Sequence, residues 1–389
     1  MALDWNFSGQ AMSDPLNNPF LTSDGQQWVP FSDQEKYATI LFTLFQYARL
    51  LVWPHPLTHD YYPFHITPQN FHQLPVVAAI AVYGLLLLVA LWGLWKRKPV
   101  AYGILFFLLP LLLVANVLFP VGTFMAERFL FMPSVGFCLA LAALGTGLAE
   151  RFKKATVAVL AVFVLIALGF SVHTLLRNPD WSGNKALFQA DISVSPNSAK
   201  LRNSLGTVLL TEALQTPDLA QRRKLLEEAE QHLKRAIELH PTYYDAILAY
   251  GACAFYLEQY DMSVAAYRGA GRLNPQDTKN TTGLALALRY GGEFYANRRR
   301  DPERAVGYLM EAWQLTRDTA IARSLALQYE TMGRPAAAAQ WLEKALSLAP
   351  NEPQLMNALV KAYIAAGDKV KAAEVEKRAK SFTTFSPAN

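Results

Sequence analysis

One charged pair interrupts a long apolar tract of this sequence. Glu127 and Arg128 lie between residues 99–119 and residues 129–149, and neither flanking range contains a charged residue. An unpaired carboxylate or guanidinium group is costly to bury in hydrocarbon, so the pair must lie at a membrane surface or face a polar cavity. Two interpretations remain open. The pair marks a helix end at the interface, which chemistry alone favours, or it belongs to a site for a charged, lipid-linked substrate.

Uncharged segments predict four membrane-spanning helices. Each has roughly the 20 residues needed to cross the hydrocarbon core of a bilayer. These segments are residues 74–95, 99–119, 129–149 and 155–176. Trp92 and Trp95 end the first segment as interface anchors, and Pro110 predicts a kink in the second.

A further apolar segment, residues 37–53, is at the short limit for a span and contains Gln46 and Arg49. It could be spanning or interfacial, and the acidic character of residues 1–36 slightly favours the interface. Residues 1–36 have turn-forming sequences and no signal-peptide pattern, so we interpret them as a polar loop segment. A chain that opens in such a loop is expected to be a fragment of a longer membrane protein.

The next loop, residues 54–73, is rich in histidine and aromatic residues. Four of the seven histidines of the chain lie there: His55, His59, His65 and His72. A metal site with Asp60 is conceivable, but Pro54 and Pro56 prevent the helix that would bring two histidines to one face, and the spacing matches no zinc signature. We therefore predict no metal site and interpret the aromatic residues as an interfacial belt.

Basic loops predict how the membrane segment is oriented. The clusters at residues 96–98 and 151–154 are separated by two predicted spans, so both can lie in the cytoplasm, where basic loops gather. The loops at residues 54–73 and 127–128 then lie on the opposite side, together with everything after Leu176. The solenoid described next is therefore predicted to be extracytoplasmic.

After Arg177 the sequence becomes densely charged and repetitive. Residues 178–197 are a turn-rich linker, and residues 198–389 carry a repeat with a period near 34, seen from Pro241 to Pro275. Small or apolar residues recur where paired helices must approach: Ala229, Leu233, Ala236, Ser263, Tyr267, Ala270, Leu325, Ala326, Ala338, Leu342 and Ala345. We predict about five tetratricopeptide repeats, in which these residues serve packing and the stack forms a groove for a protein or peptide.

The predicted fold class is all-α, with a multi-span membrane domain over residues 37–177 followed by a tetratricopeptide α-solenoid. The net charge of +5 is modest and no basic run with interleaved aromatic residues is present, so no nucleic-acid partner is predicted. Cys138 and Cys253 fall in different halves of the chain, so we expect them to be packing residues and predict no disulfide framework.

This combination of features resembles one family. The stretch at residues 126–137, Ala-Glu-Arg-Phe-Leu-Phe-Met-Pro-Ser-Val-Gly-Phe, followed by tetratricopeptide repeats, is similar to the transmembrane and tetratricopeptide repeat-containing (TMTC-like) protein O-mannosyltransferases and their bacterial relatives. Residues 50–54 and 57–61 resemble the middle of that family's membrane region. The resemblance covers most of the chain, and the stretch at residues 126–137 is more specific than the repeats.

The resemblance implies a membrane glycosyltransferase of the C-type fold (GT-C). Such enzymes transfer a sugar, often mannose, from a polyprenyl-phosphate donor to a hydroxyl of a protein acceptor on the outer face, here expected to be that of a bacterial inner membrane. Arg128 would pair with the donor phosphate, and Glu127 would orient Arg128 or contact the sugar. His59 is a further substrate-binding candidate. No cofactor other than the lipid-linked donor substrate is implied.

The catalytic carboxylate of the family usually follows the first span, and the N-terminal catalytic membrane half is expected to be missing here. The catalytic base is therefore unassigned, with Asp60 as a weak candidate. The alternative function is a non-catalytic, membrane-anchored tetratricopeptide scaffold for protein–protein interaction. An enzyme predicts loss of sugar transfer on replacing Arg128, whereas a scaffold predicts loss of a partner on replacing groove residues.

Overall fold

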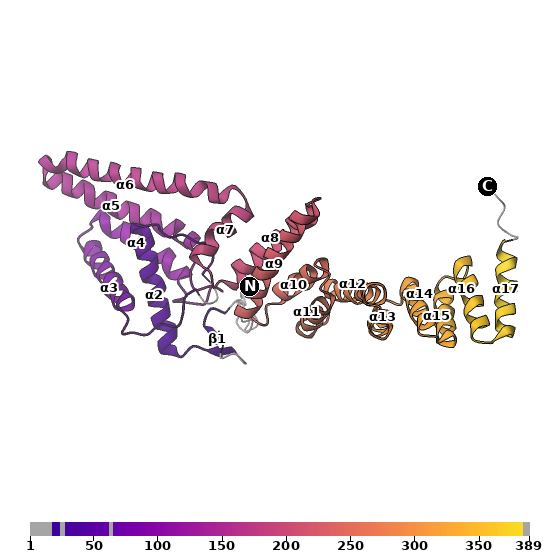
Figure 1. Ribbon diagram of the computed structural model, residues 1–389. Helices are drawn as coiled ribbons and strands as arrows, with labels where there is room; N and C mark the ends of the chain where they lie inside the picture. Colours follow the sequence, from indigo (N-terminus) through magenta and orange to yellow (C-terminus); the bar gives the residue numbers. More distant parts are fainter. Residues whose placement is uncertain (1–17, 24–27, 62–64, 384–389) are drawn as a thin grey trace. The chain divides into compact units, whose positions relative to one another are not determined.

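The fold is helical almost throughout, which confirms the predicted all-α class (Figure 1). The computed structural model describes residues 18–23, 28–61 and 65–383. The chain divides into two compact units. Unit 1 comprises Met1–Thr211 and Gln231–Tyr243, and unit 2 comprises Glu212–Glu230 and Tyr244–Asn389.

The membrane-type helices all belong to unit 1. The elements up to the start of the repeats are α2 (Asp33–Val52), α3 (Leu74–Trp95), α4 (Pro99–Val114), η1 (Glu127–Leu130), α5 (Phe131–Arg151), η2 (Lys153–Ala155), α6 (Thr156–Arg177), η3 (Asn178–Ser182) and α7 (Asn184–Val194). Three helical stretches in the described chain are long and apolar enough to cross a membrane: Leu74–Trp95, Glu127–Arg151 and Thr156–Ser182. They indicate that the chain associates with a membrane.

Two predicted segments differ from the observed helices in length. The helix predicted over residues 99–119 ends at Val114, because Asn116 turns the chain with a φ of 60°. The Asn116 side chain donates to the Thr123 and Phe124 carbonyl oxygens (2.9 and 3.0 Å) and accepts from the Val121 N–H (2.8 Å). This turn brings the chain back toward Glu127, where η1 begins.

The segment predicted over residues 37–53 starts earlier, at Asp33. Ser32 caps α2, since its hydroxyl accepts from the Glu35 N–H (3.3 Å) while the Glu35 carboxylate accepts from the Ser32 N–H (2.9 Å). Tyr47 on α2 is fully buried, and its hydroxyl accepts from the Ala126 N–H (3.1 Å). Helix α2 thus packs into the core of unit 1 beside the segment that leads to Glu127.

Small residues let α4 and α5 pack closely. A Cβ atom added at Gly136 would meet the Phe107 backbone nitrogen and the Gly103 carbonyl oxygen, and one added at Gly103 would meet the Ala140 backbone. Such close backbone approach is typical of helix pairs in membranes. It fixes α5 against α4, and η1, which carries the Glu127–Arg128 pair, leads directly into α5.

A short hairpin was not predicted. Strand β1 (Leu21–Ser23) pairs antiparallel with β2 (Trp28–Pro30), with Thr22 opposite Val29. The Trp28 ring lies 4.7 Å from the His240 ring, centroid to centroid, so the hairpin contacts a residue of unit 1 that is distant in sequence.

The repeat region consists of consecutive helices, which Figure 1 shows in chain order. They are α8 (Ala199–Gln215), α9 (Leu219–Leu239), α10 (Tyr244–Tyr256), α11 (Tyr260–Leu273), α12 (Thr278–Phe294), η4 (Tyr295–Arg299, a π-helix), α13 (Pro302–Thr316), α14 (Thr319–Thr331), α15 (Pro335–Leu348), α16 (Pro353–Ala365) and α17 (Lys369–Thr383). The eleven packing residues named above are all buried, none more than 6% exposed, whereas Tyr329 and Ala379, which recur in the same pattern, are only partly buried. These helices form the predicted tetratricopeptide solenoid.

The two cysteines form no disulfide. Cys253 is buried within the solenoid, whereas Cys138 is exposed on α5.

Candidate functional site

A four-residue stretch of the loop after α2 is bonded at every position. The Thr58 N–H donates to Glu127 Oε1 (2.6 Å), and the Tyr61 hydroxyl donates to the same oxygen (2.8 Å). Between them, His59 contacts Asp191 and Asp60 accepts a hydrogen bond from Ser198 Oγ (2.5 Å). We call residues 58–61 the clasp, because they join the start of α5 to α7 and to the residue before α8.

The clasp holds the Glu127 carboxylate in one orientation. Burial raises the pKa of Tyr61, and the Glu127 carboxylate raises it further, so the phenol keeps its proton and acts as a donor. Thr58 is fully buried and donates through its backbone, which no substitution other than proline removes. One oxygen of Glu127 therefore accepts two hydrogen bonds from neutral donors.

Asp191 anchors the other side of the clasp. It is fully buried on α7, and its Oδ2 atom accepts from the His59 N–H and lies 2.8 Å from His59 Nδ1. Its Oδ1 atom forms a close ion pair with the Arg177 guanidinium. Burial alone would raise the pKa of Asp191, but the bonds from His59 and Arg177 outweigh it and hold that pKa below its ordinary value.

A cavity of about 550 Å³ opens beside these groups. Its apolar lining comes from α2 and the loop after it, from η1 and the start of α5, and from α6 and η3: Leu50, Leu51, Pro54, Leu57, Leu130, Phe131, Phe170 and Trp181. Its polar lining is Glu127, Arg128, Ser134, His173, Thr174, Arg177 and Asn178. The Glu127–Arg128 pair thus faces a cavity whose lining is partly polar and partly apolar.

Glu127 and Arg128 do not form an ion pair, although they are adjacent in sequence. The Arg128 guanidinium lies 5.3 Å from the Phe129 ring centroid, and no carboxylate of a described residue lies within ion-pairing distance of it. These contacts do not support the prediction that Glu127 orients Arg128. Both side chains line the cavity, so both can contact a ligand there. A cation without a carboxylate partner at an apolar cavity can bind an anion that carries an apolar chain.

The loop histidines are spread over different surroundings. His59 is bonded to Asp191, His65 lies against the Tyr61 ring, and His55 lies 6.1 Å from the His173 ring. Within the described ranges, no group of three His, Cys, Asp or Glu side chains could hold a metal ion. Burial lowers the pKa of His65, which favours its neutral form.

Of the predicted site residues, Glu127 and Arg128 line the cavity, whereas His59 is not part of its lining and is bonded to Asp191. Asp60 is hydrogen-bonded to Ser198, at the residue before α8. Sequence reasoning missed Arg177 and Asp191. Asp191 follows Leu187 by four residues on α7, so the two share a helix face, and both are buried. A charged residue on the apolar face of a short helix was the available signal.

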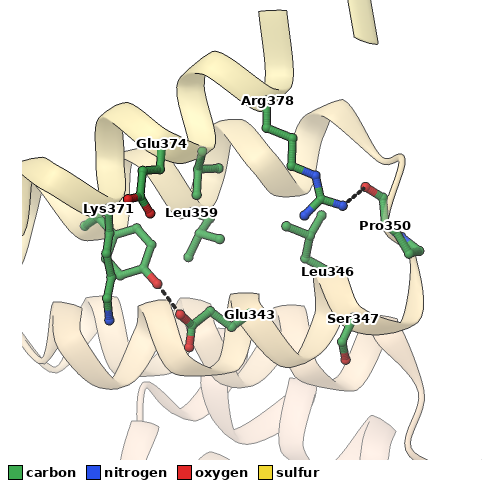
Figure 2. A pocket seen from close by; sticks show the side chains of 10 residues that line it. Glu343, Leu346, Ser347, Pro350, Leu359, Lys371, Glu374 and Arg378 are labelled. Atoms are coloured by element: carbon green, nitrogen blue, oxygen red, sulfur yellow. Dashed lines mark hydrogen bonds between the residues drawn. The ribbon is translucent and has the colours of Figure 1, made fainter. Parts of the chain in front are cut away.

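The solenoid has grooves of its own. One, of about 470 Å³, lies between α15, α16 and α17, where Figure 2 shows Glu343, Leu346 and Leu359 facing Glu374 and Arg378. Arg378 donates to the Pro350 carbonyl oxygen (3.3 Å), and the Tyr363 hydroxyl donates to the Glu343 carboxylate. A second groove, of about 350 Å³, has a mixed lining of apolar side chains, threonines and the charged residues Arg289 and Asp318.

Known proteins resemble both parts of the chain. The family model for the tetratricopeptide repeat matches residues 324–352, the copy that the sequence shows most clearly. Protein O-mannosyl-transferase TMTC4 of Mus musculus is 30% identical over 157 residues, which are 37% of this chain and 21% of that protein. Protein O-mannosyl-transferase Tmtc1 of Drosophila melanogaster is 39% identical over 39% of this chain and 16% of its own length.

Human protein O-mannosyl-transferase TMTC1 is 28% identical over 60% of this chain and 26% of its own length. The chain is similar to part of the TMTC proteins. It therefore spans only about a fifth of the length of such curated relatives as TMTC4, and the resemblance noted from the sequence is confirmed over that part.

Two solved structures are similar to about half of the chain, at low identity. MamA is 17% identical over 46% of this chain and 97% of its own, with a TM-score of 0.31. YrrB, described as a TPR protein with an unusual peptide-binding site, is 17% identical over 51% of this chain and 93% of its own, with a TM-score of 0.33.

Proposed function

We propose that this chain is part of a membrane glycosyltransferase that moves a mannose-like sugar from a polyprenyl phosphate to a protein hydroxyl. The observation that carries the proposal is the cavity beside η1 and the start of α5, where Arg128 has no carboxylate partner among the described residues and apolar side chains are part of the lining. An anionic headgroup on an apolar chain matches both features. The homologues named as O-mannosyl-transferases support the same reaction class.

Three groups take roles in this proposal. Arg128 binds the donor phosphate, the apolar lining takes the first part of the prenyl chain, and Glu127 accepts a hydrogen bond from the sugar. The clasp keeps Glu127 in place through Thr58 and Tyr61. The base that takes the proton of the acceptor hydroxyl is unassigned, and Asp60, whose Oδ2 atom accepts from Ser198, stays the weak candidate among the described residues.

The test is binding and transfer by the full chain and its Arg128→Ala variant. A photoreactive prenyl phosphate would be cross-linked in membranes, and mannose transfer from a polyprenyl-phosphate donor would be measured alongside. Loss of a charge-assisted contact is expected to weaken phosphate binding about tenfold or more. Arg151→Ala, at the other end of α5, is the matched control and should bind as the unaltered chain does.

Unchanged phosphate binding by Arg128→Ala would overturn the proposed role of the cavity. The alternative, a membrane-anchored scaffold, is favoured by the groove between α15 and α17. It predicts no specific prenyl-phosphate binding, together with loss of a protein partner when Glu374 or Arg378 is replaced.

The solenoid is proposed to lie on the extracytoplasmic side of a bacterial inner membrane and to bind the protein acceptor. Support comes from the basic loops at residues 96–98 and 151–154. A cysteine introduced at the exposed Leu327 would react with an impermeant maleimide added from outside. Labelling only after the membrane is opened to the cytoplasmic side would contradict this orientation.

A further inference from the structure

The two arginines that line the cavity differ in whether carboxylates of the described residues already pair with them. Arg128 has no carboxylate partner among the described residues. Both terminal nitrogens of Arg177 are occupied, since Nη1 lies 2.9 Å from Asp180 Oδ2 and Nη2 forms a close ion pair with Asp191 Oδ1. Only Arg128 is therefore free to meet the charge of a ligand.

Asp191 lies behind Arg177 and does not line the cavity. Its side chain is fully buried and both of its oxygens have charged or polar partners, so it stays ionised and in place. Asp180 is about one-third exposed and pairs with Arg177 from the same turn of the chain. The position of Arg177 is thus determined from two sides.

The charges of these five side chains determine how a negatively charged ligand would interact with the cavity. Arg177 with its two aspartates carries a net charge of −1, and Glu127 offsets Arg128. The first negative charge of a ligand can pair with Arg128, but a second is repelled by Glu127 in the lining and by the net negative charge of Arg177 with its two aspartates. Repulsion by a fixed negative charge grows in proportion to the charge of the ligand.

We propose that Asp191, assisted by Asp180, is a specificity-determining residue that makes the cavity prefer a phosphate group with one negative charge over a group with two. This inference rests on the proposed function, because it assumes that the cavity binds a prenyl-linked phosphate. The sugar-linked donor of that function is itself a phosphodiester with one negative charge, and the inference adds the residues that select this charge.

The test compares two ligands with the same apolar chain. Geranylgeranyl monophosphate carries nearly two negative charges at pH 8, since the second pKa of a phosphate monoester is about 6. Its monomethyl phosphodiester carries one. Affinities for both would be measured on the full chain in nanodiscs of uncharged lipid, and the readout is the ratio of the monoester affinity to the diester affinity.

Asp191→Asn is expected to raise that ratio about threefold or more, because removing a negative charge helps the doubly charged ligand most. Loosening of the clasp would weaken both ligands alike and cancel in the ratio. Asp180→Asn should raise the ratio in the same direction, and it serves as the test if the buried substitution prevents folding. Glu150→Gln, a carboxylate-to-amide change at the far end of α5, should leave the ratio unchanged.

The outcomes separate the two proposals. An unchanged ratio in a folded Asp191→Asn or Asp180→Asn variant, with clear binding by the unaltered chain, overturns this inference and leaves the proposed function standing. Failure of the unaltered chain to bind either ligand overturns the proposed function and this inference with it.

Discussion

At the scale of single residues, Asp191 shows how this fold buries a charge. The carboxylate is inaccessible to solvent, yet it pairs with Arg177 and accepts two bonds from His59. Removing one partner of such a group leaves the rest buried and unpaired, which costs far more than the net value of the pair. The clasp therefore depends on α7, which lies more than a hundred residues further along the chain.

Acid should weaken the clasp. The pKa of Asp191 is lower in the folded chain than its ordinary value of 3.8, so its stabilising contribution is complete above that value and is lost as the pH falls through the folded pKa. We expect the melting temperature in detergent to drop steeply below about pH 4. In Asp191→Asn the melting temperature should be lower at neutral pH and less dependent on pH in that range. An equally steep drop in the variant would contradict this role.

The Tyr61 hydroxyl should stabilise the loop through Glu127. Tyr61→Phe keeps the buried ring and removes the donor to Glu127 Oε1, which should cost about 1 to 3 kcal/mol. Hydrogen exchange should quicken at the Thr58 and His59 amides. Tyr37→Phe is the matched control, because Tyr37 is 52% exposed and its replacement should leave exchange in the clasp as it was.

At the scale of elements, the packing of α4 against α5 depends on Gly136. A β-branched side chain there would press on the backbone of Phe106 and Phe107, and overpacking of this kind costs about 1 to 3 kcal/mol. Gly136→Val should therefore lower the melting temperature in detergent. Gly147→Val, on the same helix with open space around it, should have a smaller effect, and equal effects of the two substitutions would argue against close packing at Gly136.

The helices that were predicted best are those whose composition alone requires them. Residues 74–95 are uncharged and apolar throughout, and α3 has the same bounds. The end of α4 was not predictable from hydropathy, because Asn116 acts through bonds to carbonyl oxygens seven and eight residues ahead. The hairpin at Leu21–Ser23 was missed for a related reason, since turn-forming residues in a polar segment do not indicate how the flanking strands pair.

Two of the four charged residues discussed at the site were predicted from the sequence, and two were not, because the second pair acts through contacts between distant segments. Glu127 and Arg128 stand out as charges in an apolar tract, and both line the cavity. Asp191 and Arg177 lie at sequence positions where charge is ordinary, and their role arises from contacts between segments far apart in the chain. Sequence periodicity locates helix faces, but it does not reveal which buried carboxylate meets which arginine.

At the scale of the whole molecule, the two units have separate apolar cores. One core contains Tyr47, Leu111 and Phe124, all in unit 1, and the other includes Leu309, Leu325 and Leu342, all in unit 2. A repeat array transmits stability mainly between neighbouring repeats. Damage to one core is therefore expected to stay largely within its own unit.

Leu325→Ala should cost about 2 to 5 kcal/mol, because the side chain is fully buried on α14. Hydrogen exchange should quicken in the helices around α14, while the amides of the clasp keep their protection. Leu327→Ala removes the same atoms from an exposed position of α14 and should change exchange little. Faster exchange in the clasp of the Leu325→Ala variant would show that the two cores are coupled.

Helix α6 has no buried side chain along its described length, Thr156–Arg177, yet it ends at the arginine that Asp191 binds. Its length in residues, more than the identity of each side chain, must then be preserved. Exchanging one apolar residue for another within it should be tolerated, whereas deleting a single residue would rotate Arg177 by about 100° around the helix axis and away from its partners. The number of residues in α6 therefore sets the direction in which Arg177 points. Engineered or natural variants of this protein should differ freely in the apolar residues of α6 while keeping the same number of them before Arg177.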